Sequence, residues 1–388
     1  SISDDNFMSG KYVFERNGST GKVVNEGNIN AALGGYVALL APEVQNAGVV
    51  VARAGTVALA AGELITLNVD NNGSLAGITT TPSTVASLIE NKLAVQAPDG
   101  QIILSAVGLN KLQTGVIKNS GSLEANSITN KGGKVYLEGD DITLTSTSRL
   151  EAKGPAGGGT VLIGGDWQGS GDLRQATKVT MEAGASIDAS ATDNGDGGKV
   201  VLWSDIHNPD SVTRAQGNIK AEAGPNGGDG GQVETSSHLL KIDGIQVSTK
   251  AAQGSAGKWL LDPYDVTIST AATSNETQSG NVYTPGANSS VINNGDLQTA
   301  LGNGNVEVAT TGSGTQSGNI NVASDISWSN ASTLTLTAAG YISATAGKNI
   351  NIGNSSGALV FNSGRGISYS GTISGSGSFT KTGTGSIF

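Results

Sequence analysis

The sequence predicts an all-β protein wound as a right-handed parallel β-helix. Three observations support this: a glycine-rich composition with few aromatic residues, a recurring two-part phrase of short apolar strands, and a repeat of about 21 residues in the shortest units. The chain has 388 residues, of which 58 are glycine and 4% are aromatic. A multilayered core needs more large side chains, whereas a narrow bore of Val, Ile, Leu and Ala does not.

The first part of the phrase is a short strand of the form apolar, any residue, alanine. It occurs as Ile29-Asn30-Ala31, Val50-Val51-Ala52, Leu123-Glu124-Ala125, Leu150-Glu151-Ala152, Ile187-Asp188-Ala189 and Ile219-Lys220-Ala221. Five of the six middle residues are polar, so we expect one face of this strand to be buried and the other to meet water. The glycines two positions ahead, at Gly27, Gly48, Gly121 and Gly217, indicate a turn at a fixed corner.

The second part is a longer strand that begins with glycine and has valine at its third position. It occurs at residues 35–39, 55–59, 133–137, 159–163, 198–202 and 231–235. The gap between the alanine and this valine varies from 5 to 12 residues. The longer gaps are rich in Gly, Asn and Asp, so we expect them to be surface loops of variable length.

Short strands at this period leave no room for a crossover helix, so successive turns should stack as parallel strands. The right-handed coil follows the usual hand of parallel crossovers. We expect residues 1–70 to form the first part of the β-helix and residues 71–262 to be a rod with variable loops. Residues 263–388 are richer in Ser, Thr and Asn, and either continue the rod or form a second β domain. One helical turn is expected from Asn294 through Leu297 to Leu301.

The charge distribution argues against several partners. The net charge is −10, and the 22 basic residues are scattered rather than clustered. Nucleic acid or an anionic membrane would call for a basic patch, so neither is expected as a partner. There is no cysteine and there are only two histidines, which argues against disulfides, thiolate metal sites and histidine-based catalysis.

Several phrases resemble the filamentous-haemagglutinin-like exoproteins of bacterial two-partner secretion. They are "NEGNINAALGGYVALLAPEVQNAGVVVARAGTVALAAGE", "GGKVVLWSD", "GGDGGQVETSSH" and "GKWLLDPYDVTI", in this order along the chain. The group includes large adhesins and biofilm-matrix proteins. The resemblance implies a right-handed parallel β-helix that is exported through an outer-membrane β-barrel transporter and acts as a secreted or cell-surface protein of a Gram-negative bacterium. It implies no catalytic residues.

One departure from that family concerns export. Its secretion domain carries Asn-Pro-Asn motifs near its start, and no such tripeptide occurs here. We therefore expect this sequence to begin near the end of that domain, with residues 1–70 as the end of its secretion-domain-like β-helix, so that engagement of the transporter depends on a part that this sequence lacks.

Carboxylates in glycine-rich turns raise two further possibilities. Glu138, Asp140 and Asp141 could act as paired acids in polysaccharide cleavage, as could Asp193 and Asp196. Asp in such turns ordinarily serves local backbone hydrogen bonds, and we favour that interpretation. No cofactor is expected. A loose Ca²⁺ contact is a minor alternative, because "DNGDGG" matches neither established calcium-loop spacing.

The segment "GKVVLWSD", residues 198–205, directs Val200 and Leu202 to one face and Trp203 to the other. One interpretation is that Trp203 packs beneath its own loop, residues 204–216, as a small satellite core. The other is an exposed ring that stacks on a sugar while neighbouring polar groups bind its hydroxyls. The candidate ligand-binding residues on that second interpretation are Trp203, Asp205, His207, Asn208, Asp166 and Trp167.

The function expected from these observations is that of a non-enzymatic adhesin segment. A stiff scaffold would present loops to exopolysaccharide, to host glycans or to copies of itself. Two alternatives stay open: a polysaccharide lyase or hydrolase on the same scaffold, and a pure structural spacer.

Overall fold

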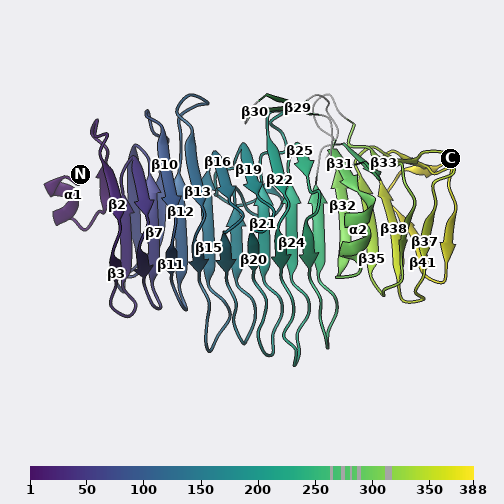
Figure 1. Ribbon diagram of the computed structural model, residues 1–388, viewed down its shortest axis with the longest axis horizontal. Helices are drawn as coiled ribbons and strands as arrows, with labels where there is room; N and C mark the ends of the chain where they lie inside the picture. The colour runs from purple at the N-terminus through teal and green to yellow at the C-terminus, as the bar shows by residue number, and fades with distance from the viewer. Residues whose placement is uncertain (263–264, 272–275, 280–281, 286–289, 311–316) are drawn as a thin grey trace.

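The computed structural model describes residues 1–262, 265–271, 276–279, 282–285, 290–310 and 317–388. It is a parallel β-helix whose successive coils stack along one long axis from the N-terminal to the C-terminal end (Figure 1). Each complete coil contributes one strand to each of three sheets. The predicted all-β, parallel β-helical fold class is therefore confirmed.

Three parallel sheets form the walls. Sheet 1 contains β2 (Lys22–Asn25), β5 (Glu43–Asn46), β10 (Ser87–Asn91), β13 (Gly115–Asn119), β16 (Asp141–Leu144), β19 (Lys178–Met181), β22 (Val212–Ala215) and β25 (Leu239–Lys241). Sheet 2 contains β3 (Asn28–Asn30), β6 (Val49–Val51), β11 (Ala94–Gln96), β14 (Ser122–Glu124), β17 (Arg149–Glu151), β20 (Ser186–Asp188), β23 (Asn218–Lys220) and β26 (Gln246–Ser248). Sheet 3 contains β4 (Tyr36–Leu40), β7 (Thr56–Ala61), β12 (Gln101–Ala106), β15 (Lys134–Gly139), β18 (Thr160–Ile163), β21 (Lys199–Trp203), β24 (Gln232–Ser236), β27 (Lys258–Asp262), β32 (Asn305–Thr310), β35 (Thr333–Ala338), β38 (Ala358–Ser363) and β41 (Ser378–Thr382).

The bore of the coil is filled by aligned columns of apolar side chains. Val57 pairs with Val37 on one side and with Ile102 on the other, and the same column continues through every later coil of sheet 3. Its members from Val57 to Leu359 are at most 1% exposed. Each such burial contributes about 1.5–3 kcal/mol before chain entropy is subtracted. Each added coil places another apolar side chain in this column, so the rod becomes longer while its core stays narrow.

A ladder of buried asparagines runs along one corner of the bore. Asn25 donates to Asn46, which donates to Asn91, which donates to Asn119, at 2.8, 2.8 and 2.7 Å. The ladder ends where Asn119 donates to Ser148 Oγ at 3.1 Å. Each amide satisfies the next, so polar groups can stay in the bore at this corner.

The glycine corner predicted from the repeat is a place of close approach. A Cβ on Gly48 would lie 2.0 Å from the carbonyl oxygen of Gly27 in the preceding coil. Gly121 faces Leu93 O at 2.1 Å in the same way. Coils stack here backbone against backbone, and only glycine leaves room.

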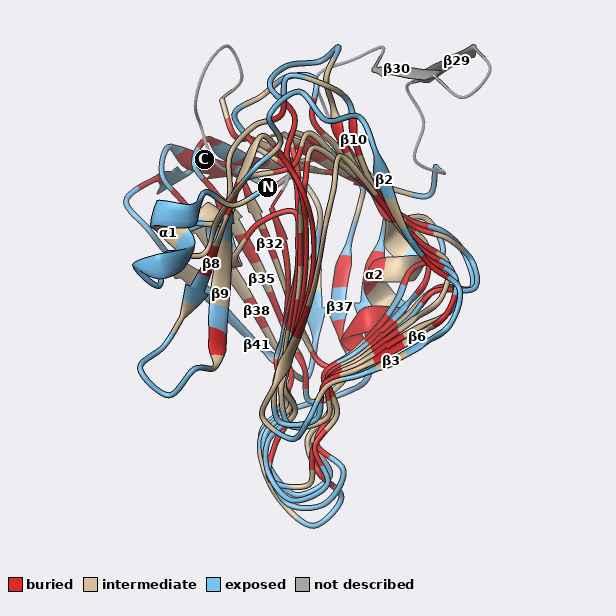
Figure 2. Cartoon of the chain, turned by 90° about the vertical axis from the view of Figure 1, so that its left-hand side faces the viewer, coloured by how far each residue is buried: buried red, intermediate tan, exposed pale blue. Residues whose placement is uncertain are grey.

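The glycine-rich loops between sheets 2 and 3 lie at the surface, as expected, and they also stack on one another to form a fin. The fin projects from one edge of the coil, where consecutive loops lie over one another (Figure 2). Gly158 N donates to Asp196 O at 2.8 Å, and Gly197 N donates to Asp229 O at 2.8 Å. A Cβ on Gly197 would lie 2.1 Å from Ala221 O, so glycine permits the loops to stack as tightly as the strands do.

The coil is interrupted once in its C-terminal third. The helix α2 (Asn294–Leu301) contacts both β26 and β34 (Ile326–Trp328), so it takes the place of one sheet 2 strand. The predicted helical turn is confirmed, with Asn293 as its N-cap. The strands β29 (Glu276–Ser279) and β30 (Val282–Pro285) pair antiparallel just before it.

Around and beyond this interruption, two new sheets lie beside sheet 3. One contains β31 (Ser290–Asn293), β28 (Val266–Ser269), β33 (Ile320–Val322), β36 (Tyr341–Ala344), β39 (Gly366–Ser368) and β42 (Ser386–Ile387). The other contains β34, β37 (Ile350–Ile352) and β40 (Ile373–Gly375). Sheet 3 itself crosses residues 70 and 262 without a break, while the domain boundaries placed there stay predictions.

A small antiparallel cover sheet lies on the outer face of sheet 3 at the N-terminal end. It consists of β1 (Val13–Glu15), β8 (Leu64–Val69) and β9 (Leu75–Thr80), preceded by the short helix α1 (Asp4–Met8). Figure 2 shows it beside sheet 3, on the opposite side of the bore from α2. The repeat did not predict this sheet, because β8 and β9 are an insertion between two coils. Among the described residues, no helix has the length and apolar character needed to cross a membrane.

Candidate functional site

The outer face of sheet 3 is covered in two separate pieces. The cover sheet packs Ile65, Leu67 and Leu75 onto Ala58 and Ala60. Farther along the rod, the 164–175 loop, which we call the lid, lies over β18 and β21 and contains the short 3-10 helix η1 (Trp167–Gly169). Between these two pieces, the outward side chains of β15 are left partly open, and a cleft results.

Trp203 belongs to the second covered region. It is 1% exposed and packs with Leu162, Val201 and Ile206. Its Nε1 donates to Gln175 Oε1 at 3.0 Å. The exposed sugar-stacking interpretation of Trp203 is therefore wrong, because the ring is buried in a satellite core.

The cover over Trp203 comes largely from the preceding coil. A Cβ on Gly165 would lie 2.5 Å from Trp203 Cδ1, and one on Gly169 would lie 2.6 Å from Cζ2. Ile206 is the contribution of the tryptophan's own loop. The glycines of "GGDWQGSG" are the sequence feature that could have predicted this lid. Without side chains of their own, they leave room for the indole ring of Trp203.

Asp205, His207 and Asn208 form backbone turns instead of a sugar site around Trp203. Asp205 Oδ1 accepts from His207 N at 2.9 Å, and Asn208 Oδ1 accepts from Asp210 N at 3.1 Å. Lys111 forms an ion pair with Asp210 from the loop of an earlier coil. These polar groups therefore support the loop that closes one end of the satellite core.

Asp166 and Trp167 lie on the lid and remain accessible. Trp167 is half-buried, with Lys258 Nζ 5.8 Å from its ring centroid. Asp166 Oδ1 accepts from Trp167 N at 2.6 Å and from Lys199 Nζ at 3.2 Å. Asp166 also lines the cleft, so one predicted ligand-binding residue does border an open site.

The cleft has a volume of about 510 Å³. Its floor is the outer face of β15 and β18, with Tyr136 and Leu162 at registered positions. Thr80 and Pro82 belong to the wall beside the cover sheet, while Asp172 and Arg174 of the lid form the opposite wall. Desolvation by burial, and then the nearby charge of Asp166, raise the pKa of Tyr136.

The polar walls of the cleft are partly paired. Glu138 accepts from Ser105 Oγ at 2.7 Å and from Arg174 N at 3.1 Å. Arg174 Nε donates to Asp140 Oδ1 at 2.9 Å, while Asp140 Oδ2 accepts from the backbone of Gly108 and Gly115. Hydrogen bonds thus hold Asp140 as a structural anion, as the turn interpretation predicted for it.

Two other acids are buried farther along sheet 3. Glu234 is 0% exposed and accepts from Gln168 N at 2.8 Å, which fastens the lid to β24. Burial raises its pKa to about 7. Asp262 is 4% exposed, and burial, followed by the charges of Glu234 and Glu307, raises its pKa to about 7. The sequence did not predict either burial, because the residue pattern of a strand does not show which outward side chains a distant loop will cover.

The acidic turns of the fin are satisfied internally. Asn226 Nδ2 donates to Asp193 Oδ1 at 2.7 Å, and Asp229 N donates to Asp196 Oδ1 at 2.8 Å. In the part of the chain that the structure describes, no three His, Cys, Asp or Glu residues are grouped so that they could hold a metal ion.

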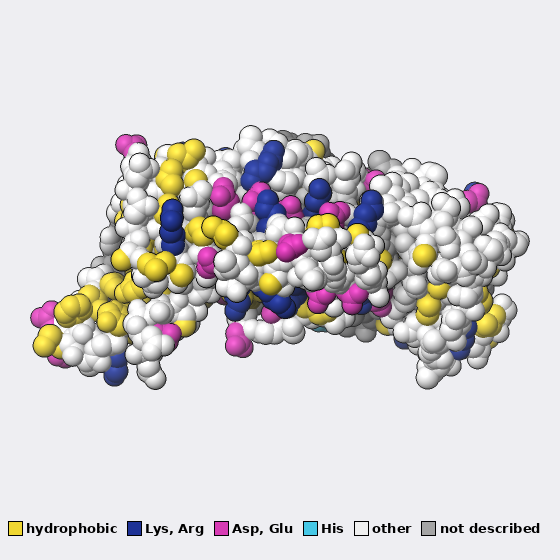
Figure 3. All heavy atoms as spheres, turned by 90° about the horizontal axis from the view of Figure 1, so that it is seen from below, with side chains coloured by type: hydrophobic (Ala, Val, Ile, Leu, Met, Phe, Trp, Pro, Cys, Tyr) yellow, Lys and Arg dark blue, Asp and Glu magenta, His cyan; other side chains and the backbone are white. Residues whose placement is uncertain are grey.

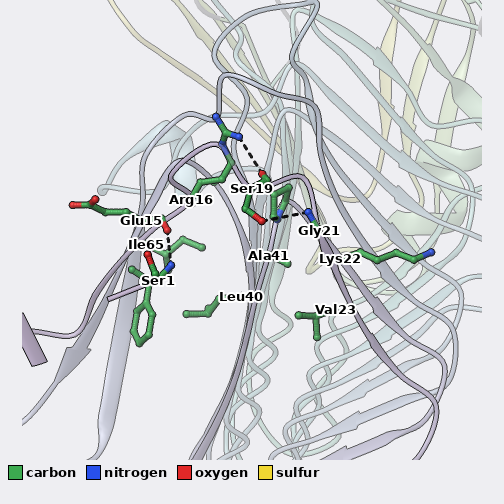
Figure 4. A pocket seen from close by; sticks show the side chains of 13 residues that line it. Ser1, Glu15, Arg16, Ser19, Gly21, Lys22, Val23, Leu40, Ala41 and Ile65 are labelled. Atoms are coloured by element: carbon green, nitrogen blue, oxygen red, sulfur yellow. Dashed lines mark hydrogen bonds between the residues drawn. The ribbon is translucent and has the colours of Figure 1, made fainter. Parts of the chain in front are cut away.

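A second hollow, of about 280 Å³, lies at the N-terminal end beneath β1 (Figure 4). Phe14, Leu40 and Ile65 form part of its apolar wall. The N-terminal amine donates to Glu15 O at 2.6 Å, and Arg16 Nη1 donates to Ser19 O at 3.0 Å. The Ser1 amine and the Arg16 guanidinium therefore bind backbone carbonyls of nearby residues.

Comparisons with known proteins agree on one class. Residues 1–152 match the family model described as the TPS secretion domain. The heme/hemopexin-binding protein of Haemophilus influenzae is 29% identical over 138 residues, which are 36% of this chain and 14% of that protein. The chain thus spans a small part of that curated relative.

A solved structure agrees in sequence and in fold. The crystal structure of the HMW1 secretion domain from Haemophilus influenzae superposes with a TM-score of 0.51 and 29% identity, covering 68% of this chain and 72% of that one. Such a domain implies an outer-membrane TpsB transporter as its partner. Together with the uninterrupted coil of sheet 3, these matches show a two-partner secretion domain in residues 1–152 and a chain similar to exoproteins that Gram-negative bacteria secrete across the outer membrane.

Proposed function

We propose that the protein is a non-enzymatic surface or biofilm-matrix adhesin, in which a stiff rod presents binding surfaces to polysaccharide or host glycans. The observation that carries this proposal is the continuity of sheet 3 from β4 to β41. A single ladder of parallel strands resists bending between the secretion domain and the far end of the chain. The proposal includes association between copies of this rod.

We also propose that exposed apolar side chains of the secretion domain contact the transporter. Phe7, Met8, Leu33, Leu109 and Leu112 are all exposed and lie within residues 1–152. Across the described residues between 153 and 340, no large apolar side chain is comparably exposed. Exposed apolar groups of this size are typical of contact sites.

The charge pattern suits a rod that remains in solution after export. Seen from the fin side, acidic and basic side chains alternate along the central part, whereas apolar side chains gather at the N-terminal end (Figure 3). Interspersed charges disfavour nonspecific clustering of rods. Self-association would therefore depend on defined surfaces instead of general stickiness.

Attachment tests the adhesin proposal. Beads coated with the purified chain are expected to bind bacterial or host cells, and soluble polysaccharide should reduce this binding. Beads coated with a reduced and alkylated serum albumin serve as the control. Equal retention of both kinds of bead would reject the adhesin and leave a structural spacer.

A polysaccharide lyase or hydrolase is the competing function, suggested by Glu138 and Asp140 beside the cleft. The bond from Arg174 to Asp140 and the backbone bonds to the same carboxylate disfavour it as a general acid or base. Incubation with bacterial polysaccharides should release neither reducing ends nor unsaturated products. Release that is abolished by Glu138→Gln would support the enzyme instead.

A further inference from the structure

We propose that the cleft between the cover sheet and the lid binds an amino sugar with a free, protonated amine. This inference rests on the proposed function, since it names a ligand class for a glycan-binding rod. Its evidence is the shape of the cleft, the half-buried ring of Tyr136 and the excess of carboxylates around it.

The architecture explains why an aromatic ring is accessible here. In the register of sheet 3, Tyr136 pairs with Ile103 on one side and with Leu162 on the other. Both neighbours are buried, Ile103 on the cover-sheet side and Leu162 beneath the lid. Tyr136 lies between the two covers, so part of its side chain faces the cleft. A half-buried aromatic ring is the usual platform for the apolar face of a sugar.

The carboxylates that line the cleft indicate the charge of the ligand that it would bind. Glu138, Asp166 and Asp172 line it, whereas Arg174 is its only basic lining residue and already binds Asp140. Lys199 lies 3.2 Å from Asp166 and offsets that one carboxylate. Within the described chain, Asp172 is exposed and has no hydrogen bond or ion pair. A cation is therefore favoured, and uronic, sialylated or sulfated sugars would be repelled.

The dimensions and polar groups favour a sugar over a basic peptide. A volume of about 510 Å³ lies within the range of small-molecule sites. The threonines at the cover-sheet edge and the carboxylates of Glu138 and Asp166 offer acceptors to several hydroxyls at once. A lysine ammonium presents its donors at a single point, whereas these acceptors are spread over the walls and the floor of the cleft.

The test compares three tetrasaccharides by isothermal titration calorimetry with the full chain at about pH 6, where a primary amine of this kind is protonated. The glucosamine tetramer should bind. The N-acetylglucosamine tetramer should bind roughly tenfold or more weakly, which corresponds to about 1.4 kcal/mol. The galacturonate tetramer should not bind measurably.

Two variants locate the binding. Asp172→Asn should weaken the glucosamine tetramer roughly tenfold. Glu26→Gln removes an exposed carboxylate outside the cleft and should leave the affinity unchanged. Tyr136→Leu removes the aromatic ring and should abolish binding. An unchanged circular dichroism spectrum would show that this variant is folded.

Three outcomes would overturn the inference: no binding of the glucosamine tetramer, equal binding of its acetylated counterpart, or equal binding of tetralysine. Failure here is distinguishable from failure of the adhesin proposal. If coated beads retain cells while no amino sugar binds, the adhesin stands and this ligand is wrong. If the amino sugar binds while beads retain no cells, the cleft stands and the adhesin is wrong.

Discussion

Two sides of the same strands behave differently in sheet 3. On the inner side, Val57, Val135 and Val233 repeat one residue type at one position. On the outer side, the registered column holds Ala58, Tyr136 and Glu234, which belong to three chemical classes. The inner side meets the same environment in every coil. The outer side meets a cover sheet, a cleft or a lid, so its composition follows whatever lies on it.

This difference teaches where function can arise in a coil of this kind. A change in the bore alters stacking, whereas a change on the outer face of sheet 3 can create a pocket without disturbing the stack. The cleft lies where one cover ends and the next begins. The predictions below test whether the two sides respond as differently as their contacts indicate.

The largest effect is expected from Trp203→Ala on the outer side. Removal of this 1% exposed ring should lower the free energy of unfolding by roughly 3–5 kcal/mol, because a large cavity is left beneath the lid. Urea unfolding measures this loss. Trp167→Ala should cost clearly less, since that ring is half-buried. Equal losses for both variants would argue against the satellite core.

The next effect concerns stacking along the bore. Gly48→Ala should lower the free energy of unfolding by about 3 kcal/mol, because its Cβ would lie 2.0 Å from Gly27 O. Gly27→Ala is the matched control at the same corner of the first coil, where nothing lies within 4 Å of the added Cβ. It should change stability by no more than about 0.5 kcal/mol. Similar melting temperatures for the two variants would contradict backbone stacking at this corner.

The asparagine ladder should produce a smaller effect. Asn91→Ala removes the side-chain acceptor of Asn46 and the side-chain donor to Asn119, at an expected cost of about 2 kcal/mol. Asn28→Ala, an exposed position outside the ladder, is the control in the same urea experiment. A ladder variant as stable as the control would show that these amides are dispensable.

The last prediction is a dependence of stability on pH. The pKa of Glu234 rises from 4.5 to about 7 on folding, and that of Asp262 rises from 3.8 to about 7. The folded state therefore binds more protons, so the free energy of unfolding should fall as pH rises from about 4 to about 7. Each pKa unit corresponds to about 1.4 kcal/mol for each carboxyl, so a fall of several kcal/mol is expected.

Two matched variants test whether Glu234 contributes to this pH dependence. Glu234→Gln should make the profile less steep, because a neutral amide has no proton to lose and Asp262 alone then contributes. Glu26→Gln changes an exposed carboxylate elsewhere and should leave the slope as it is. An unchanged slope in the Glu234 variant would show that Glu234 does not contribute to this pH dependence.

Much of the coil could be predicted from sequence because its environment repeats. Val37 over Val57 and Asn25 beside Asn46 are adjacent in space at the same period at which they recur in sequence. The helical turn at α2 was also predictable, since the capping asparagine and Leu297 and Leu301 are local signals. The cover sheet was not, because β8 and β9 are strands whose partners lie outside the repeat.

The candidate site was predicted only in part. Asp166 and Trp167 do lie beside an open surface, whereas Trp203 is buried and Asp205 and Asn208 serve turns. Tyr136 and Asp172 escaped notice because nothing in a single strand or loop shows that two covers stop on either side of β15. Their significance comes from residues far away along the chain.

By itself, the sequence determined the parallel coil, because each buried position faces its own counterpart one turn away and needs only the right residue class at the right period. Only the tertiary structure decided which outer positions are covered, since that depends on where the cover sheet and the 164–175 loop come to rest. Burial of Trp203 and Glu234, and exposure of the cleft at Tyr136, are consequences of that placement.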